Sequence, residues 1–133
     1  MSPLKRKKLN KIRLKLDRLD NSLIKLIKQR TNLVNHVIKL KDKKKLDGIR
    51  TKLDKLDNKL LALIKYRTSL VKEVLKLKEF KKEIVDQKRI NFILNKIRGK
   101  SKKLKIDPKI TNRIWKNMIW SYIDYERRNF KKY

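Results

Sequence analysis

Two cations lie on the apolar face of a predicted helix at residues 49–78. When residues are placed at 100° intervals from Leu53, a narrow apolar stripe falls within about 60° of it, formed by Leu56, Leu60, Ile64, Val71 and Val74. Arg67 and Lys78 fall at about −40° and −20°, inside the same stripe. Because a buried, unpaired cation is costly, we expect both to meet either internal carboxylates or an anionic ligand.

The spacing of these cations favours a ligand. Arg67 and Lys78 are about 16 Å apart along the helix axis, too far for one carboxylate to pair with both. Arg89 and Arg50 lie at the edges of their stripes, and Glu126 lies on the inner side of the predicted last helix. Several cations and one carboxylate around an apolar pocket are typical of a receptor for a small multivalent anion. An internal salt-bridge network, for example Arg67 with Glu126, is the alternative.

Other kinds of chemistry find little support in the sequence. The chain has no cysteine, which excludes disulfides, thiol catalysis and cysteine metal sites. His36 is the single histidine and cannot form a metal site alone, so we expect no metal and no cofactor. Neither a nucleophile paired with a base nor a glycine-rich phosphate loop is visible. Catalysis would therefore be electrostatic and conformational.

Composition favours an all-α protein, and its charge would attract anionic partners. Two glycines, two prolines and 41% charged residues among 133 are typical of helices. The net charge of +29 would suit nucleic acid, but the excess is mostly lysine spread over every outward face. Arginine clusters and an aromatic stacking platform are missing, which makes nucleic acid an unlikely main partner. A positive field would equally attract a small dianion.

The N-terminal sequence MSPLKRKKLNK is basic but lacks the apolar run of a signal peptide. No stretch approaches the length of a membrane span. We therefore expect a cytoplasmic protein that makes no membrane contact.

The long helix at 49–78 occurs twice in the chain. Residues 12–41 and 49–78 align without gaps and agree at 20 of 30 positions. The repeated positions include Arg13, Asp20, Arg30 and Lys41, which recur as Arg50, Asp57, Arg67 and Lys78. The sequence therefore predicts an extra N-terminal helix in residues 1–48, followed by a helical domain in 49–133.

Turn and cap signals divide the rest of the chain. Asp47-Gly48 is the turn signal between the long helices and marks either a tight hairpin or a weak point in one long helix. A second break covers about 79–86, with Asp86 as an N-cap. A shorter helix is predicted at about 87–100, ended by Gly99 and the lysines that follow it. Asp107-Pro108 then begins the last helix. Its predicted inner side consists of Ile110, Ile114, Met118, Ile119, Tyr122 and Glu126.

Residues 49–130 resemble the all-helical type II chorismate mutase family. The spacing of Arg50, Asp57, Arg67 and Lys78 in the long helix matches the family signature. The Asp86-x-x-Arg89 start of the middle helix and the Asp-Pro start of the last helix match as well. The resemblance implies rearrangement of chorismate to prephenate, a pericyclic step of aromatic amino acid biosynthesis in the shikimate pathway.

The resemblance also implies roles for individual residues. Lys78 and Glu126 would face the ether oxygen of chorismate, and Asp86 would lie near its ring hydroxyl. Arg67 and Arg89 would line the pocket and bind carboxylates.

Two pocket positions depart from the common family pattern. Ile90 replaces a usual Glu, and Tyr122 replaces a usual Ser. Both departures resemble the isochorismate pyruvate lyase branch of the same fold, which is the alternative activity. A non-catalytic basic helical protein that binds nucleic acid is a further alternative.

The repeated helix leaves the oligomeric state open. In the family, the long helices of two subunits run antiparallel, and each site takes one arginine from the partner. Arg50 would be that arginine in a homodimer. A hairpin between the two copies would instead bring Arg13 to the site within one chain. The protein would then be an intramolecular pseudo-dimer, a monomer with one working site.

Overall fold

The computed structural model describes residues 1–131 of the chain. These residues form four α-helices and one short 3₁₀ helix, without any strand. The elements are α1 (Pro3–Lys39), α2 (Lys43–Leu77), η1 (Lys81–Glu83), α3 (Gln87–Lys103) and α4 (Pro108–Asn129). The prediction of an all-α fold with two long helices, a shorter middle helix and a last helix is confirmed.

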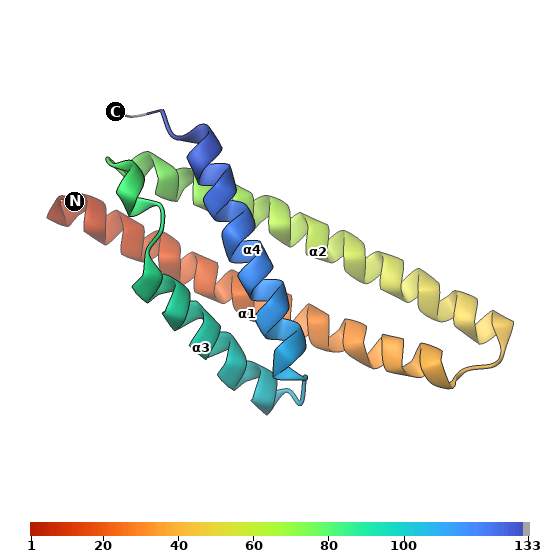
Figure 1. Cartoon of the computed structure of the whole chain (residues 1–133). Coiled ribbons are helices and arrows are strands. Elements are labelled where there is room, and N and C mark those ends of the chain that lie inside the picture. Colours follow the sequence, from red (N-terminus) through yellow and green to blue (C-terminus); the bar gives the residue numbers. More distant parts are fainter. Residues whose placement is uncertain (132–133) are drawn as a thin grey trace.

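The two long helices form an antiparallel hairpin (Figure 1). Its connection is residues 40–42, and Asp42 caps α2 by accepting a hydrogen bond from the Lys44 backbone N–H at 2.9 Å. The prediction of a turn at Asp47-Gly48 was wrong, because Gly48 lies inside α2 with an ordinary negative φ. A glycine inside a helix costs only about 1 kcal/mol, which packing between the long helices readily offsets.

Two ion pairs show that the hairpin has an internal two-fold relation. Arg67 Nε lies 3.4 Å from Asp20 Oδ1, and Arg30 Nε lies 2.9 Å from Asp57 Oδ1. A shift of 37 residues converts each partner of one pair into a partner of the other. The hairpin therefore has two equivalent ends. We call the end that holds the N-terminus of the chain the covered end, and the end that holds residues 40–42 the open end.

Helices α3 and α4 pack against the covered end and the middle of the hairpin, while the open end projects beyond them (Figure 1). Asp86 caps α3 by accepting a hydrogen bond from the Arg89 backbone N–H at 3.1 Å, as predicted. The helix continues to Lys103, slightly beyond the predicted boundary at about residue 100, and the lysines after Gly99 form its last turn. Its last turn is fixed to α4 by a buried hydrogen bond of 2.6 Å between the hydroxyls of Ser101 and Thr111.

The inner side of α4 differs from the prediction. Asp107 and Pro108 do begin the helix, but its buried residues are Thr111, Trp115, Ile119, Ile123 and Glu126. The predicted Ile110 and Ile114 are instead 46% and 38% exposed. The stripe is rotated because the fully buried Trp115 fills the core between α1, α3 and α4, and it was missing from the predicted set.

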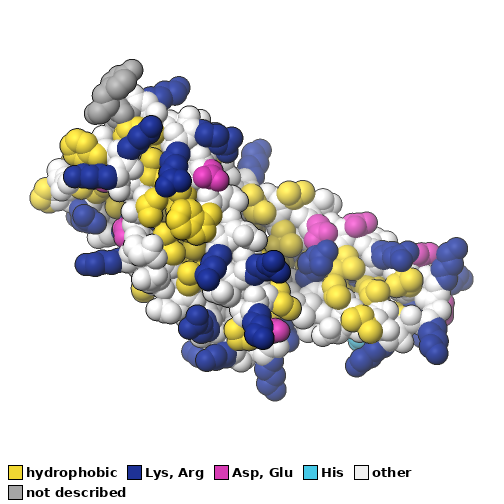
Figure 2. All heavy atoms as spheres, in the orientation of Figure 1, with side chains coloured by type: hydrophobic (Ala, Val, Ile, Leu, Met, Phe, Trp, Pro, Cys, Tyr) yellow, Lys and Arg dark blue, Asp and Glu magenta, His cyan; other side chains and the backbone are white. Residues whose placement is uncertain are grey.

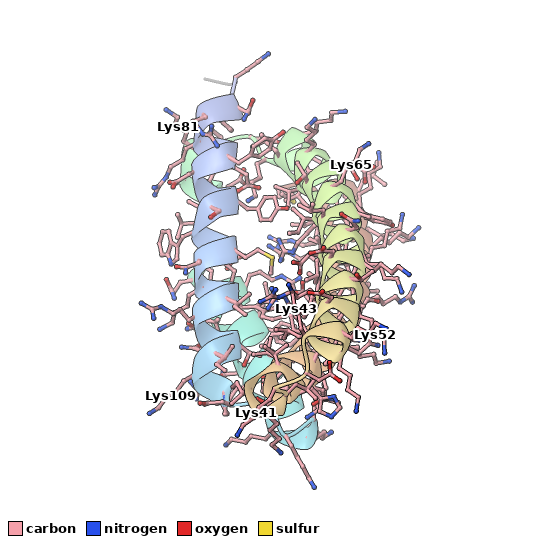
Figure 3. All side chains as sticks on the ribbon, turned by 90° about the vertical axis from the view of Figure 1, so that its right-hand side faces the viewer. Lys41, Lys43, Lys52, Lys65, Lys81 and Lys109 are labelled. Atoms are coloured by element: carbon pink, nitrogen blue, oxygen red, sulfur yellow. The ribbon has the colours of Figure 1, made fainter. Side chains whose placement is uncertain are left out.

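Basic side chains are spread over the visible face, among hydrophobic and uncharged groups and a few acidic ones (Figure 2). Figure 3 looks onto the open end, where Lys52 on α2 and Lys109 on α4 point outward on different sides of the molecule. Among residues 1–131, no helix combines the length and the apolar character needed to cross a membrane.

Candidate active site

A small pocket of about 100 Å³ lies between the covered end of the hairpin, α3 and α4. Eight of the nine predicted site residues line it, and they come from α1, α2, α3, α4 and the segment after η1. These residues are Arg13, Arg67, Lys78, Asp86, Arg89, Ile90, Tyr122 and Glu126. Residues far apart in the sequence therefore meet at one place.

The deepest polar group of the pocket is the pair formed by Lys78 and Glu126. Lys78 is the residue that ends α2, and its ammonium group donates to the two Glu126 oxygens at 3.2 and 3.1 Å. The side chains are only 8% and 7% exposed. Burial raises the pKa of Glu126 above its ordinary value, and the nearby charges of Lys78 and Arg13 only partly oppose this effect. Glu126 is thus easier to protonate than an ordinary glutamate.

The planar guanidinium of Arg67 makes one contact at its edge and another across its face. Its Nε donates to Asp20 from α1, and its guanidinium lies 5.0 Å from the centre of the Tyr122 ring. The Tyr122 hydroxyl is fixed by Thr68 Oγ1 at 2.9 Å and donates to the Ile64 carbonyl at 3.2 Å. These contacts leave the terminal nitrogens of Arg67 as the donors available to a ligand.

Two further ion pairs close the side of the pocket nearest solvent. Arg89 Nη2 lies 2.8 Å from Asp17 Oδ1, and Arg13 Nη2 lies 3.0 Å from Asp86 Oδ2. Burial alone would raise the pKa of Asp86, but hydrogen bonds from the Arg89 backbone N–H and from Arg13 outweigh it and lower that pKa. The carboxylate of Asp86 therefore stays ionised beside Arg13.

Each of the four cations thus meets an internal carboxylate, although the pairs differ from the suggested Arg67–Glu126 pair. The sequence analysis did not place Asp17 and Asp20 in the site. A signal for them existed, because Arg13, Asp17 and Asp20 lie at spacings of four and three residues on one face of α1. Which cations Asp17 and Asp20 pair with depends on how α1 packs against α2 and α3.

Arg50 is the one predicted site residue that lies elsewhere. It is at the open end, its side chain is 65% exposed, and its nearest carboxylate is Asp47 at 3.9 Å. Its equivalent in the repeat, Arg13, lies in the pocket instead.

The arginines of the pocket keep hydrogen-bond donors that a small anion could use. Each guanidinium has five N–H donors, so an arginine held by one carboxylate still has donors for another. Ligand pockets commonly measure about 300–1,000 Å³, so side chains must move before a ligand enters this one. The Arg13–Asp86 pair is the most exposed of the four and is the natural place for opening. No group of three His, Cys, Asp or Glu side chains in residues 1–131 is arranged to hold a metal ion.

Comparison with known proteins identifies the helical domain. The family model for chorismate mutase type II matches residues 49–127, more than half of the chain. No curated protein and no solved structure matches the chain. The matched segment contains most of α2, all of α3 and nearly all of α4, and these helices supply most of the pocket. The chain therefore belongs to the type II chorismate mutase family.

Proposed function

We propose that this protein is a chorismate mutase, and that it rearranges chorismate to prephenate in the pocket at the covered end. The observation that supports this most is the buried Lys78–Glu126 pair, which shares its pocket with Arg13, Arg67 and Arg89. The rearrangement forms no covalent bond with the enzyme. It requires a folded substrate conformer and stabilisation of negative charge that develops on the ether oxygen.

Lys78 and Glu126 have the chemistry for that oxygen. The ammonium group of Lys78 supplies a positive charge, and a protonated Glu126 supplies a second hydrogen-bond donor. The raised pKa of Glu126 makes that protonation easier. When substrate enters, the ether oxygen replaces part of the contact between the two side chains.

The arginines would bind the two carboxylates of chorismate. Arg67 offers its terminal nitrogens, since its Nε is already bonded to Asp20. Arg89 would exchange its contact with Asp17 for a substrate carboxylate, and Asp86 would approach the ring hydroxyl. A bidentate pair between arginine and carboxylate is strong enough to orient the substrate.

We also propose that one chain forms one complete site. Arg13 from α1 lines the pocket beside Asp86 and supplies the cation that a second long helix would contribute. The equivalent cations of the open end, Arg30 and Arg50, have no second α3 and α4 to cover them. We therefore expect a monomer with one active site.

A second candidate activity is isochorismate pyruvate lyase. Two observations favour it. Ile90 is buried in the pocket, where it offers no group to a substrate hydroxyl, and the Tyr122 hydroxyl is bonded to Thr68 rather than free for a ligand.

Product analysis separates these activities. The purified protein is incubated with chorismate and, separately, with isochorismate, and prephenate and salicylate are quantified. Prephenate supports the mutase and salicylate supports the lyase. Formation of neither product would contradict both.

A matched pair of variants tests the single-chain site. Arg13→Ala should lower kcat/KM by about two orders of magnitude, since it removes a cation from the pocket, whereas Arg50→Ala should change it little. Light scattering should give the mass of one chain for both variants and for the unaltered protein. A dimer that needs Arg50 and tolerates Arg13→Ala would refute the arrangement.

A further inference from the structure

A groove that the proposed reaction does not use lies where the open end of the hairpin meets the first half of α4, and we call it the open-end groove. It encloses about 520 Å³ and is lined by side chains of α1, α2 and α4. Its apolar floor includes Leu23, Ile27, Leu60, Ile64, Ile110 and Ile114. Three of these remain well exposed, namely Ile64 at 41%, Ile110 at 46% and Ile114 at 38%. A contiguous exposed apolar surface of this kind usually marks an interaction site.

The internal two-fold relation shows what shape of partner fits. The shift of 37 residues relates Arg30, Thr31 and Val34 of the groove to Arg67, Thr68 and Val71 of the covered end. There, α4 lies over the equivalent surface: Tyr122 stacks on Arg67 and bonds to Thr68. Val71 is consequently 6% exposed, whereas Val34 is only half-buried. The groove is thus the repeat of a surface that already binds a helix.

A helix that filled the groove would have to come from another molecule. The chain has a single α4, which already forms one side of the groove with Ile110, Ile114, Trp115 and Met118 and packs its buried residues against α1 and α3. A second copy would bring its own charge of +29 to an open end that is itself basic. Residues 28–59 contain eleven Lys and Arg against four Asp, a surplus of seven positive charges. Figure 2 shows basic side chains beside the uncovered hydrophobic ones on this projecting part. Charge therefore favours an acidic partner.

We propose that the open-end groove binds an amphipathic helix of a partner protein. The apolar face of that helix fills the groove, and its outward face is acidic. Helices bind such grooves through apolar side chains spaced three and four residues apart. The binding is separate from catalysis, because the groove and the pocket lie on different parts of the hairpin and share no lining residue.

The test uses a peptide derived from α4 itself, since α4 covers the equivalent surface. The probe has the sequence of residues 108–130, carries a fluorescent label, and has five basic residues replaced by Glu. These residues are Lys109, Arg113, Lys116, Arg127 and Arg128. Anisotropy should show saturable binding to the full chain at micromolar concentration. The same peptide with its native charges should bind at least about tenfold more weakly, as should a scrambled acidic peptide.

Two matched variants locate the binding. Ile110→Asp places a charge in the groove and should weaken binding by about tenfold or more, because the carboxylate would be desolvated on binding. Leu61→Asp makes the same change in charge at a side chain that is 64% exposed and outside the groove, and should leave binding within about twofold. Chorismate turnover should be unaffected by Ile110→Asp. Circular dichroism confirms that both variants are folded.

Three results would overturn the proposal. The first is no saturable binding of the acidic peptide. The second is equal binding by the Ile110→Asp and Leu61→Asp variants. The third is a full-length chain that is dimeric and becomes monomeric with Ile110→Asp, since a second copy would then occupy the groove.

Discussion

At the scale of single residues, four cations and four carboxylates form ion pairs in and beside the pocket, and their charges sum to zero. The proposed substrate would replace some of these contacts when it binds. Lys78 and Glu126 form the most enclosed contact with two hydrogen bonds, and Arg67 is fixed by Asp20 and by the ring of Tyr122. Breaking a buried pair by removing one partner normally leaves a costly unpaired charge. In this pocket, Glu126 can relieve that cost by taking a proton, because burial already raises its pKa.

Lys78→Ala should lower kcat/KM by at least about two orders of magnitude, the usual effect of losing an electrostatic donor in an active site. The fold should survive, since the remaining Glu126 becomes neutral. Steady-state kinetics with chorismate measure the effect. Lys72→Ala is the control, because Lys72 is an exposed lysine on the same helix. Near-normal turnover in a folded Lys78→Ala protein would exclude the role given to Lys78.

Glu126 should make activity depend on pH. Its folded-state pKa is raised, so the protonated, hydrogen-bond-donating form is present at low pH and is lost as pH rises through that pKa. Activity should therefore decline toward alkaline pH. The contribution of Glu126 to stability should fall over the same range, because the folded state binds the proton more tightly than the unfolded chain.

The Glu126→Gln variant tests this directly. An amide donates a hydrogen bond at every pH, so the profile of kcat/KM should be flatter on the alkaline side. An unchanged profile would mean that Glu126 serves only as the ion-pair partner of Lys78.

At the scale of helices, local cap residues decide where helices begin, and tertiary packing decides how far they continue. Asp42, Asp86 and Asp107 each cap the helix that follows, and each accepts a hydrogen bond from a backbone N–H of its first turn. Both glycines lie inside helices, because α2 is already capped by Asp42 before Gly48 and the last turn of α3 after Gly99 is held to α4 by the buried Ser101–Thr111 hydrogen bond. A glycine therefore marks a helix end only when tertiary contacts also stop there.

Gly48→Ala should stabilise the protein by roughly 0.5–1 kcal/mol, since alanine loses less backbone freedom on forming a helix. An added Cβ at this position meets no atom within 4 Å, so no strain opposes the gain. Urea unfolding followed by circular dichroism gives the free energy. The same change at Gly99, which is equally unobstructed, provides an independent comparison. A destabilised Gly48→Ala protein would indicate that the chain turns there after all.

At the scale of the whole molecule, the repeated helix makes a hairpin that has two equivalent ends but a single α3–α4 pair. The covered end gains the pocket, with Arg13, Asp17 and Asp20 supplied by α1. The open end keeps the equivalent Arg30–Asp57 pair and leaves apolar side chains exposed. Residues of both long helices of one chain therefore line the same pocket.

Deleting residues 1–46 should convert the proposed monomer into a dimer. Without α1, the apolar residues Leu56, Leu70 and Val74 of α2 lose their partner, and α2 of a second chain can replace it because the helices are copies. Light scattering should then give twice the mass of the shortened chain.

The same deletion should exchange the roles of two arginines. Arg50 of each shortened chain would occupy the place of Arg13 in the neighbouring site, so Arg50→Ala should abolish activity only in the shortened protein. A shortened chain that is monomeric and fully active would contradict the proposed role of α1.

The sequence by itself determined the all-α class, the caps of α3 and α4, the family and most of the pocket residues. These features depend on local chemistry: the 3.6-residue period, the Asp caps, and cations such as Arg67 placed where an apolar residue would be expected. Only the tertiary structure decided where the hairpin turns, that Asp17 and Asp20 pair with Arg89 and Arg67, and that Ile110 and Ile114 stay exposed. The reason is that a helix face is fixed locally, whereas its partner depends on how distant segments pack, and here the fully buried Trp115 set the rotation of α4.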